Sequence, residues 1–356
     1  MTSGAQIARR PEPAHEGQPI LLVFTIDTEP DNQWENHRNR SLANITRLPA
    51  FHASISALGV RPTYLVTQTV ADDMKASEIL RELQLDGAEI GAHLHVWESP
   101  PFLTSDDDRR FAAFGHDLPV EHFSAKLAGL TASIGQVFGA PTSYRAGRFG
   151  FAAEHIVVLE QLGYRVDSSI TPLVDRRAKV GIPLNKGGRG GRDYRRAPLD
   201  AYKPDYADDL RPGRARLWEL PLTAGPRRNL PSVMLAVHQR GPQLLQRALR
   251  KLRISEIVTA SPVHYSAERF GQMLETAASQ GRRVLNLTLH SSETMAGGSP
   301  SIRDSDSLRA LFDRIRQVVE RLQRRFIIKG CTLSEAAAEL ERESSTAARG
   351  ETSTCR

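Results

Sequence analysis

The sequence is poor in cysteine and has no long apolar run. Its 356 residues include two cysteines, Cys331 and Cys355, so neither a disulfide framework nor a four-cysteine zinc site can be built. No stretch approaches the roughly 18 consecutive apolar residues of a transmembrane helix. The first residues include two arginines but no apolar segment behind them, as a signal peptide would have. We therefore expect a cytoplasmic protein without a signal peptide or a transmembrane segment.

Aromatic residues are also few, at 6% of the chain, and they are sparse among the basic residues. This pattern does not favour nucleic acid as a partner. The net charge of +6 is unevenly placed, because arginines crowd between Arg176 and Arg253. That section should attract a phosphate-bearing or acidic glycan, or make peripheral contact with an anionic membrane. Alternatively, these arginines only solvate a long insertion.

The composition is otherwise that of a globular protein, with 40% hydrophobic and 25% charged residues. One large catalytic domain is compatible with this length. We expect it to span residues 18–342, with a loop insertion rich in Gly, Pro and Arg at about 171–229. The flanking residues 1–17 and 343–356 are small and polar, which predicts disorder. The sequence does not indicate an oligomeric state.

Apolar runs and amphipathic segments alternate along the predicted domain, as in βα units. Strands are predicted at 20–26, 62–66, 88–92, 143–146, 164–168, 217–222, 233–237 and 284–289. Helices are predicted at 41–58, 70–85, 120–138, 152–162, 243–253, 267–280, 305–325 and 333–342. This order predicts an α/β fold with a parallel sheet, doubly wound or closed into a barrel, whose chemistry gathers at the carboxyl ends of the strands.

Polar residues follow the first and third predicted strands. Asp27 and Glu29 come directly after the first strand, where capping or solvation is the alternative role for a carboxylate. His93 and His95 follow the third strand. Because residues two apart in an extended segment project to the same side, these two imidazoles are candidates to share one metal ion.

Three further polar residues end later strands. Arg145 is placed to pair with a carboxylate and hold it ionised, although a structural ion pair would explain it equally well. Asp167 ends the fifth strand, and His290, the end of the last strong strand, is a candidate proton donor. All these sets fall where one edge of the sheet would bring them together.

The order of these motifs resembles the polysaccharide deacetylase family, also called the NodB-homology or carbohydrate esterase four group. The resemblance covers about residues 21–340 and implies a distorted (β/α) barrel of about seven parallel strands, with the Arg-rich insertion as an addition. It also implies a metal-dependent hydrolase, with Zn²⁺ as the expected metal, that removes an N-acetyl group from an amino sugar. The substrate would be an N-acetylated glycan, or a lipid-linked or nucleotide-linked sugar.

The family's opening motif, Thr-Phe-Asp-Asp-Gly, corresponds to residues 25–29, which makes Asp27 the general base. The family's metal-binding Asp falls on Thr28, whose hydroxyl is a poor zinc ligand, so we expect Glu29 to supply the oxygen. The converse assignment, with Asp27 on the metal and Glu29 as the base, stays open.

The remaining motifs carry over one residue at a time. The family's His-x-x-x-His matches at His93, but Trp97 stands four residues later, so His95 takes over as the second imidazole ligand. The chain thus resembles a variant branch with His-x-His. Arg145 matches the arginine that pairs with the base, Asp167 the fourth motif, and His290 the catalytic acid.

Two other functions remain open at this point. The same fold and site would serve a hydrolase of a cyclic ureide or another non-sugar amide. The departures at Thr28 and Trp97 would also suit a metal-containing glycan-binding protein without catalysis.

Overall fold

Strand β1 (Ile20–Thr28) is the central strand of the fold, and all of its residues after Ile20 are buried. Along one edge it pairs with β9 (Val284–His290). Along the other edge it pairs first with β10 (Ile328–Cys331) and then with β2 (Pro62–Val66). All three pairings are parallel, as the unbroken apolar run of β1 predicts for a strand covered on both faces.

The sheet continues from β2 through four strands in the order of the chain. These are β3 (Glu89–Leu94), β4 (Ser143–Ala146), β5 (Val166–Asp167) and β6 (Trp218–Glu219). Within the described residues, eight strands form this one sheet, against the expected number of about seven. Beyond β6 the chain reaches β9, where Thr223 N donates to Asn286 O at 3.0 Å. The parallel sheet therefore curls into a distorted α/β barrel, as predicted.

The computed structural model describes residues 17–31, 41–102, 113–179, 190–251 and 254–353. The prediction of disorder for residues 1–17 thus falls almost wholly outside the described residues. No helix in the described part of the chain combines the length and the apolar character that a membrane crossing requires.

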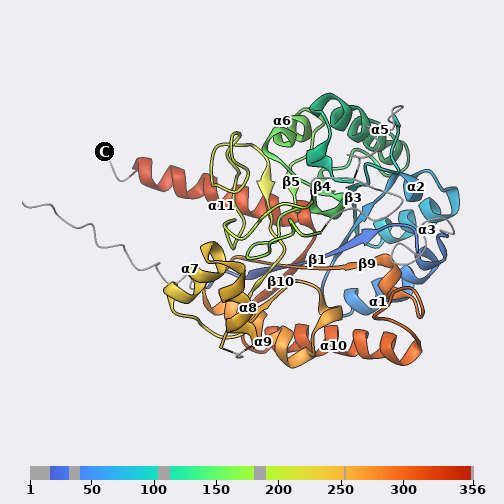
Figure 1. Ribbon diagram of the computed structural model, residues 1–356. Coiled ribbons are helices and arrows are strands. Elements are labelled where there is room, and N and C mark those ends of the chain that lie inside the picture. Colours follow the sequence, from blue (N-terminus) through green and yellow to red (C-terminus); the bar gives the residue numbers. More distant parts are fainter. Residues whose placement is uncertain (1–16, 32–40, 103–112, 180–189, 252–253, 354–356) are drawn as a thin grey trace, which may run out of the picture.

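Helices cover the sheet on its outer side (Figure 1). They are α1 (Leu48–Ser56), α2 (Gln68–Ala71), α3 (Met74–Leu85), α5 (Val120–Phe138), α6 (Ala153–Gln161), α9 (Ala267–Ser279), α10 (Ser305–Gln323) and α11 (Leu333–Ser353). Two further helices, α7 (Ser232–Arg240) and α8 (Gln243–Lys251), pack against each other. Helix α10 illustrates why they form: Leu311, Ile315 and Leu322 recur at helical spacing and are buried, and Asp304 caps its start by accepting from Ser307 N at 2.8 Å.

The prediction of a strand at 233–237 is wrong, because these residues lie in helix α7. Their β-branched and apolar composition resembles a buried strand, yet Val233 is 73% exposed and no strand among the described residues pairs with this segment. The short strand β10 and the two-stranded sheet of β7 (Gly225–Pro226) and β8 (Ile257–Val258) were not predicted.

At the other end of the chain, α11 continues to Ser353, beyond the predicted helix end at residue 342. The expected disordered tail is therefore mostly helical, since Ala, Glu and Arg favour a helix even where the pattern is polar.

Candidate metal centre and active site

Asp27 and Glu29 lie on the same face of the chain at the end of β1. Side chains alternate along a strand, so Thr28 between them points away, and its Oγ1 donates to Ile26 O at 3.0 Å. The Glu29 backbone is held from the far side by Ser291 Oγ, which is 3.1 Å from both its N and its O atom. Both carboxylates are almost fully buried, at 2% and 4% exposure.

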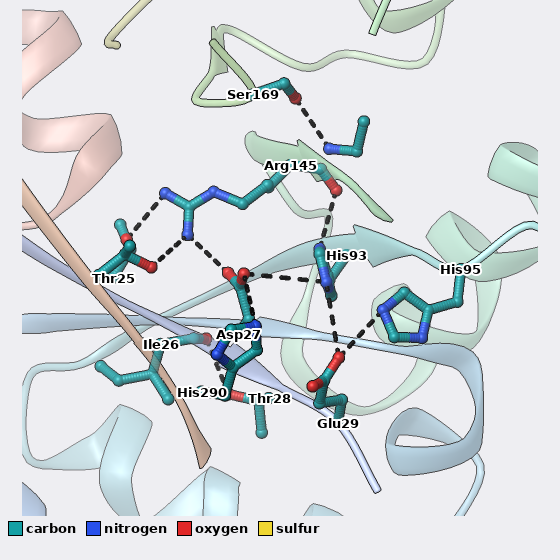
Figure 2. A network of polar contacts seen from close by, with 12 residues as sticks. Thr25, Ile26, Asp27, Thr28, Glu29, His93, His95, Arg145, Ser169 and His290 are labelled. Atoms are coloured by element: carbon teal, nitrogen blue, oxygen red, sulfur yellow. Dashed lines mark hydrogen bonds and ion pairs between the residues drawn. The ribbon is translucent and has the colours of Figure 1, made fainter. Parts of the chain in front are cut away.

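His93 and His95, at and just after the end of β3, point to the same side as predicted (Figure 2). His93 Nδ1 lies 3.1 Å from Arg145 O. Because a carbonyl oxygen only accepts, this nitrogen carries the proton. His95 Nδ1 is likewise engaged by Glu98 Oε2 at 3.1 Å. Both rings therefore turn Nε2 toward Glu29, as histidine ligands of a metal do.

The donor atoms of Glu29, His93 and His95 are close enough to share one cation. Glu29 Oε2 is 3.1 Å from His95 Nε2 and 3.9 Å from His93 Nε2, and ligand atoms of all three lie within 4.8 Å of one another. Around a tetrahedral zinc with bonds of 2.0–2.2 Å, ligand atoms are about 3.3 Å apart. A buried carboxylate with two oriented imidazoles thus fits a divalent metal.

Gly147, directly after β4, permits this arrangement. A Cβ atom at this position would lie 2.5 Å from Leu94 O and 2.9 Å from His95 Cδ2. Both distances are shorter than a van der Waals contact, so only glycine allows the chain after β4 to pass so close to the His95 ring.

Arg145 on β4 is fully buried and uses every N–H of its guanidinium. Its five hydrogen bonds run to Asp27 Oδ1 (2.5 Å), Thr288 Oγ1 (3.0 Å), Thr25 Oγ1 (2.8 Å), Ser168 O (2.8 Å) and Ser168 Oγ (2.8 Å). The predicted pairing of Arg145 with Asp27 is present. It occupies one oxygen of Asp27 and leaves the other, Oδ2, for the cavity.

Charges around Asp27 hold it ionised. Burial by itself would raise its pKa, but the positive charge of Arg145, followed by His93 and His290, lowers the pKa to about 2. His93 shows the opposite balance, since burial lowers its pKa to about 4 despite the carboxylates nearby. At neutral pH the structure thus holds a carboxylate beside a neutral imidazole with a free Nε2 lone pair, as metal binding requires.

The other two histidines of the site, His95 and His290, have raised pKa values. Burial would lower the pKa of His95, but hydrogen bonds to Glu29 and Glu98 raise it to about 9. Burial would also lower the pKa of His290, which the charges of Glu29, Glu293 and Asp27 raise to about 10. A cation bound by Glu29 and His95 would displace the proton between them.

His290 ends β9 on the opposite side of Asp27 from His93. Its Nε2 lies 4.0 Å from Asp27 Oδ2, and its Nδ1 lies 3.4 Å from Glu293 Oε2. With 28% of its side chain exposed, against 3% for Asp27, it is the more accessible of the two. It therefore presents an imidazolium to the same space that Asp27 Oδ2 faces.

These groups line one end of a cavity of about 600 Å³, large enough for a sugar residue. Trp97, Phe114 and Phe149 contribute aromatic surface to its wall, and Arg148 and Arg176 line it as well. Arg148 was not singled out from the sequence, and Arg176 was named only as the start of the Arg-rich section.

Asp167 lies one layer behind the groups that line the cavity, where a carboxylate that orients a neighbouring group is expected. Its Oδ1 accepts from Ser169 Oγ at 2.6 Å, and Ser169 Oγ accepts from Ala146 N at 2.8 Å. Asp167 also shares a hydrogen bond with Glu219 on the adjacent β6. It therefore supports the loop that holds Arg145 and does not itself contact Asp27 or either of the two metal-site histidines.

Three carboxylates that sequence reasoning missed complete the surroundings of the site. Glu98 and Glu293 each stand three residues after a site histidine and hydrogen-bond its ring, a spacing that could have indicated them. Glu219, the partner of Asp167, is distant in sequence, and no local pattern marks it.

No model of a known protein family and no curated protein matches the sequence. Solved structures do match in shape. One is a protein from Mycobacterium smegmatis assigned as a polysaccharide deacetylase, with 14% identity, 96% of each chain covered and a TM-score of 0.52. Another is a protein from Parabacteroides distasonis assigned as a glycoside hydrolase or deacetylase, with 14% identity, 93% of this chain and 73% of that one covered, and a TM-score of 0.55. The chain thus has the fold of the polysaccharide deacetylases.

Proposed function

We propose that this chain is a metal-dependent hydrolase that removes the acetyl group from the nitrogen of an amino sugar. One observation carries the proposal. The buried group of Glu29, His93 and His95 adjoins Asp27, whose Oδ2 is 4.0 Å from His93 Nε2 and 4.0 Å from His290 Nε2. A metal-ligand set, an ionised carboxylate and an imidazolium therefore share the end of one cavity.

Glu29, His93 and His95 would hold the metal. A divalent metal there supplies Lewis acidity for the acetyl carbonyl and favours ionisation of a water molecule. The geometry favours Glu29 as the ligand and Asp27 as the base over the converse, because Glu29 contacts both histidines while one oxygen of Asp27 is taken by Arg145. Asp27 Oδ2 is then the oxygen that accepts the proton of the attacking water.

His290 would protonate the departing sugar nitrogen. Its pKa, raised to about 10 by the surrounding carboxylates, keeps it protonated at neutral pH. Its partial exposure to the cavity lets it reach a bound substrate. Arg145 is a positioning residue that keeps Asp27 ionised and oriented, and Asp167 positions the Ser168–Ser169 turn behind it.

The proposal is tested by acetate release from N-acetylhexosamine derivatives, with and without a chelator, on protein whose metal content is known from elemental analysis. We expect release that the chelator abolishes and that Zn²⁺ restores. His93→Ala should lose both metal and activity. His264→Ala is the matched control, because His264 lines the same cavity outside the ligand group and should keep its metal.

Two results would overturn the assignment. Opening of a cyclic ureide without acetate release would indicate a hydrolase of non-sugar amides. Sugar binding without any release, in protein that contains stoichiometric metal, would indicate a non-catalytic glycan-binding protein.

A further inference from the structure

Most arginines of the insertion have carboxylate partners. Arg177 lies 2.7 Å from Asp175, Arg195 lies 2.6 Å from Asp193, and Arg192 lies 2.5 Å from Asp209. These pairs cross-link the described part of the insertion. These three arginines are therefore neutralised within the fold and are not candidates for binding an anion.

Arg148 and Arg176, which both line the cavity, differ from them. In the described residues neither has a carboxylate within ion-pair distance. Arg148 Nη1 is buried without a hydrogen-bond acceptor, and so is Arg176 Nε. Arg176 has one side-chain hydrogen bond, from Nη2 to Thr171 Oγ1 at 3.1 Å. Buried polar groups normally have partners, so an unsatisfied buried donor on each of two arginines that line one cavity requires an explanation.

Aromatic rings hold both guanidinium groups in place. Arg148 Cζ lies 5.3 Å from the centre of the Trp97 ring and 5.6 Å from that of Phe114. Arg176 Cζ lies 3.9 Å from the centre of the Phe149 ring. Such contacts orient a cation while leaving its N–H groups available. The two arginine side chains are thus held in a fixed orientation, while some of their N–H groups lack a hydrogen-bond acceptor.

The backbone at this wall is strained. Arg148 and Phe149 adopt φ angles of 54° and 60°, in the left-handed region that residues other than glycine seldom occupy. Strain of this kind persists where the surroundings enforce it, and it concentrates at binding and catalytic sites. Here it places the Arg148 side chain and the Phe149 ring at the cavity.

Neither cation has an ion-pair partner among the described residues. Burial lowers the pKa of Arg148, and it lowers that of Arg176 to about 10 although Tyr194 and Asp27 act in the opposite direction. A partly buried cation without an ion-pair partner is costly, and an anion that enters the cavity would remove that cost. Lys179, which is exposed and lines the same cavity, would add a third positive charge.

We propose that Arg148 and Arg176 form a subsite for an oxyanionic group, phosphoryl or carboxylate, on the same substrate molecule whose acetamido group lies at Asp27. This deepens the proposed function and rests on it for the identity of the sugar. The cavity then has two ends of opposite character, a carboxylate–imidazole end for the amide and a cationic end that selects a charged sugar. A neutral N-acetyl sugar would bind poorly because it leaves both guanidinium groups unpaired.

The test is calorimetric titration of the full chain with four probes: N-acetylglucosamine, its 1-phosphate, N-acetylglucosaminuronic acid and inorganic phosphate. We expect at least one anionic sugar to bind about tenfold or more tightly than the neutral sugar, as a charge-assisted hydrogen bond allows. The tighter of the phosphate and the uronate identifies the anion. Arg176→Gln should remove most of that preference.

Arg177→Gln is the matched control, because Arg177 is adjacent in sequence but exposed and paired with Asp175; it should change binding less than about twofold. Arg148→Gln should also remove most of the preference for an anionic sugar. If this variant fails to fold, the result for Arg176→Gln still tests the subsite. Equal binding of neutral and anionic sugars, no binding of any probe, or equal losses in Arg176→Gln and Arg177→Gln would overturn the subsite.

Acetate release measured in parallel separates the two proposals. Anion-selective binding without acetate release would support the subsite and contradict the proposed function. Release from neutral and anionic sugars with equal kcat/KM, together with no anion preference in binding, would contradict the subsite alone.

Discussion

Arg145 Nη1 donates to Asp27 Oδ1 at 2.5 Å, which joins the end of β4 to the end of β1 across the mouth of the sheet. The bond is buried, and the guanidinium has no N–H left for another partner. Asp27 is therefore held in one orientation, with Oδ2 directed at the cavity. An ionised and oriented carboxylate is what a general base requires.

Asp27→Asn should lower kcat by about 10²- to 10⁴-fold, the usual contribution of a positioned base, and leave the metal content unchanged. It should also lower the free energy of unfolding by about 3–5 kcal/mol, because Arg145 loses its buried counter-ion. Acetate release, elemental analysis and urea denaturation measure these effects. Asp72→Asn is the control, since Asp72 is an exposed residue on the outer surface. A near-normal rate in Asp27→Asn would exclude the assigned role.

Glu293→Gln should move the alkaline limb of the kcat/KM profile to lower pH. Glu293 is one of the carboxylates that raise the pKa of His290 to about 10. Removing its charge lowers that pKa, so the imidazolium loses its proton at a lower pH, while glutamine still accepts from His290 N. His290→Ala should remove the limb and most of the activity. Identical profiles for Glu293→Gln and the wild type would show that His290 is not the acid.

Gly147→Ala should reduce metal affinity, because the added Cβ would lie 2.9 Å from His95 Cδ2 and 2.5 Å from Leu94 O. The His95 ring would have to move, and a displaced second ligand binds the metal more weakly. Titration with Zn²⁺ against a competing chelator measures the change. Gly135→Ala is the matched control: a Cβ there meets nothing within 4 Å, and alanine in a helix should stabilise by about 0.5–1 kcal/mol. Equal metal affinities in the two variants would contradict the prediction.

Glu219→Gln should change how stability depends on pH. Burial raises the pKa of Asp167 to about 6 and that of Glu219 well above its usual value. The folded state therefore holds a proton that the unfolded state releases near pH 4. Each carboxyl contributes stability that is complete below about pH 4 and is lost as the pH rises through its folded-state pKa, which is about 6 for Asp167 and higher for Glu219. In the variant the loss due to Glu219 is absent, whereas Asp167 keeps its own loss because burial raises its pKa. The decline in stability from pH 4 to 7 should therefore be smaller than in the wild type. Urea denaturation from pH 4 to 7 measures the free energy of unfolding of the variant and the wild type. If the two free energies change in parallel with pH, the prediction is refuted.

The local sequence pattern was sufficient to predict those features that depend on the geometry of the chain alone. The alternation of a strand already predicts that Asp27 and Glu29 share a face, as do His93 and His95. The run at 20–26 predicts a strand covered on both faces, and β1 is one. The same kind of reasoning failed at 233–237, because a short apolar segment becomes a strand only beside a neighbouring strand, and the described part of the chain has none beside this segment.

The sequence by itself determined which side chains stand at the ends of strands, because strand and helix periods are properties of the chain. Only the tertiary structure decided which of them meet. It separated Asp167 from the metal site by one layer and joined it to Glu219. It also paired several arginines of the insertion with carboxylates, and it left Arg148 and Arg176 at the cavity without an ion-pair partner among the described residues. Charge compensation depends on distances across the fold, and residues far apart in the sequence set those distances.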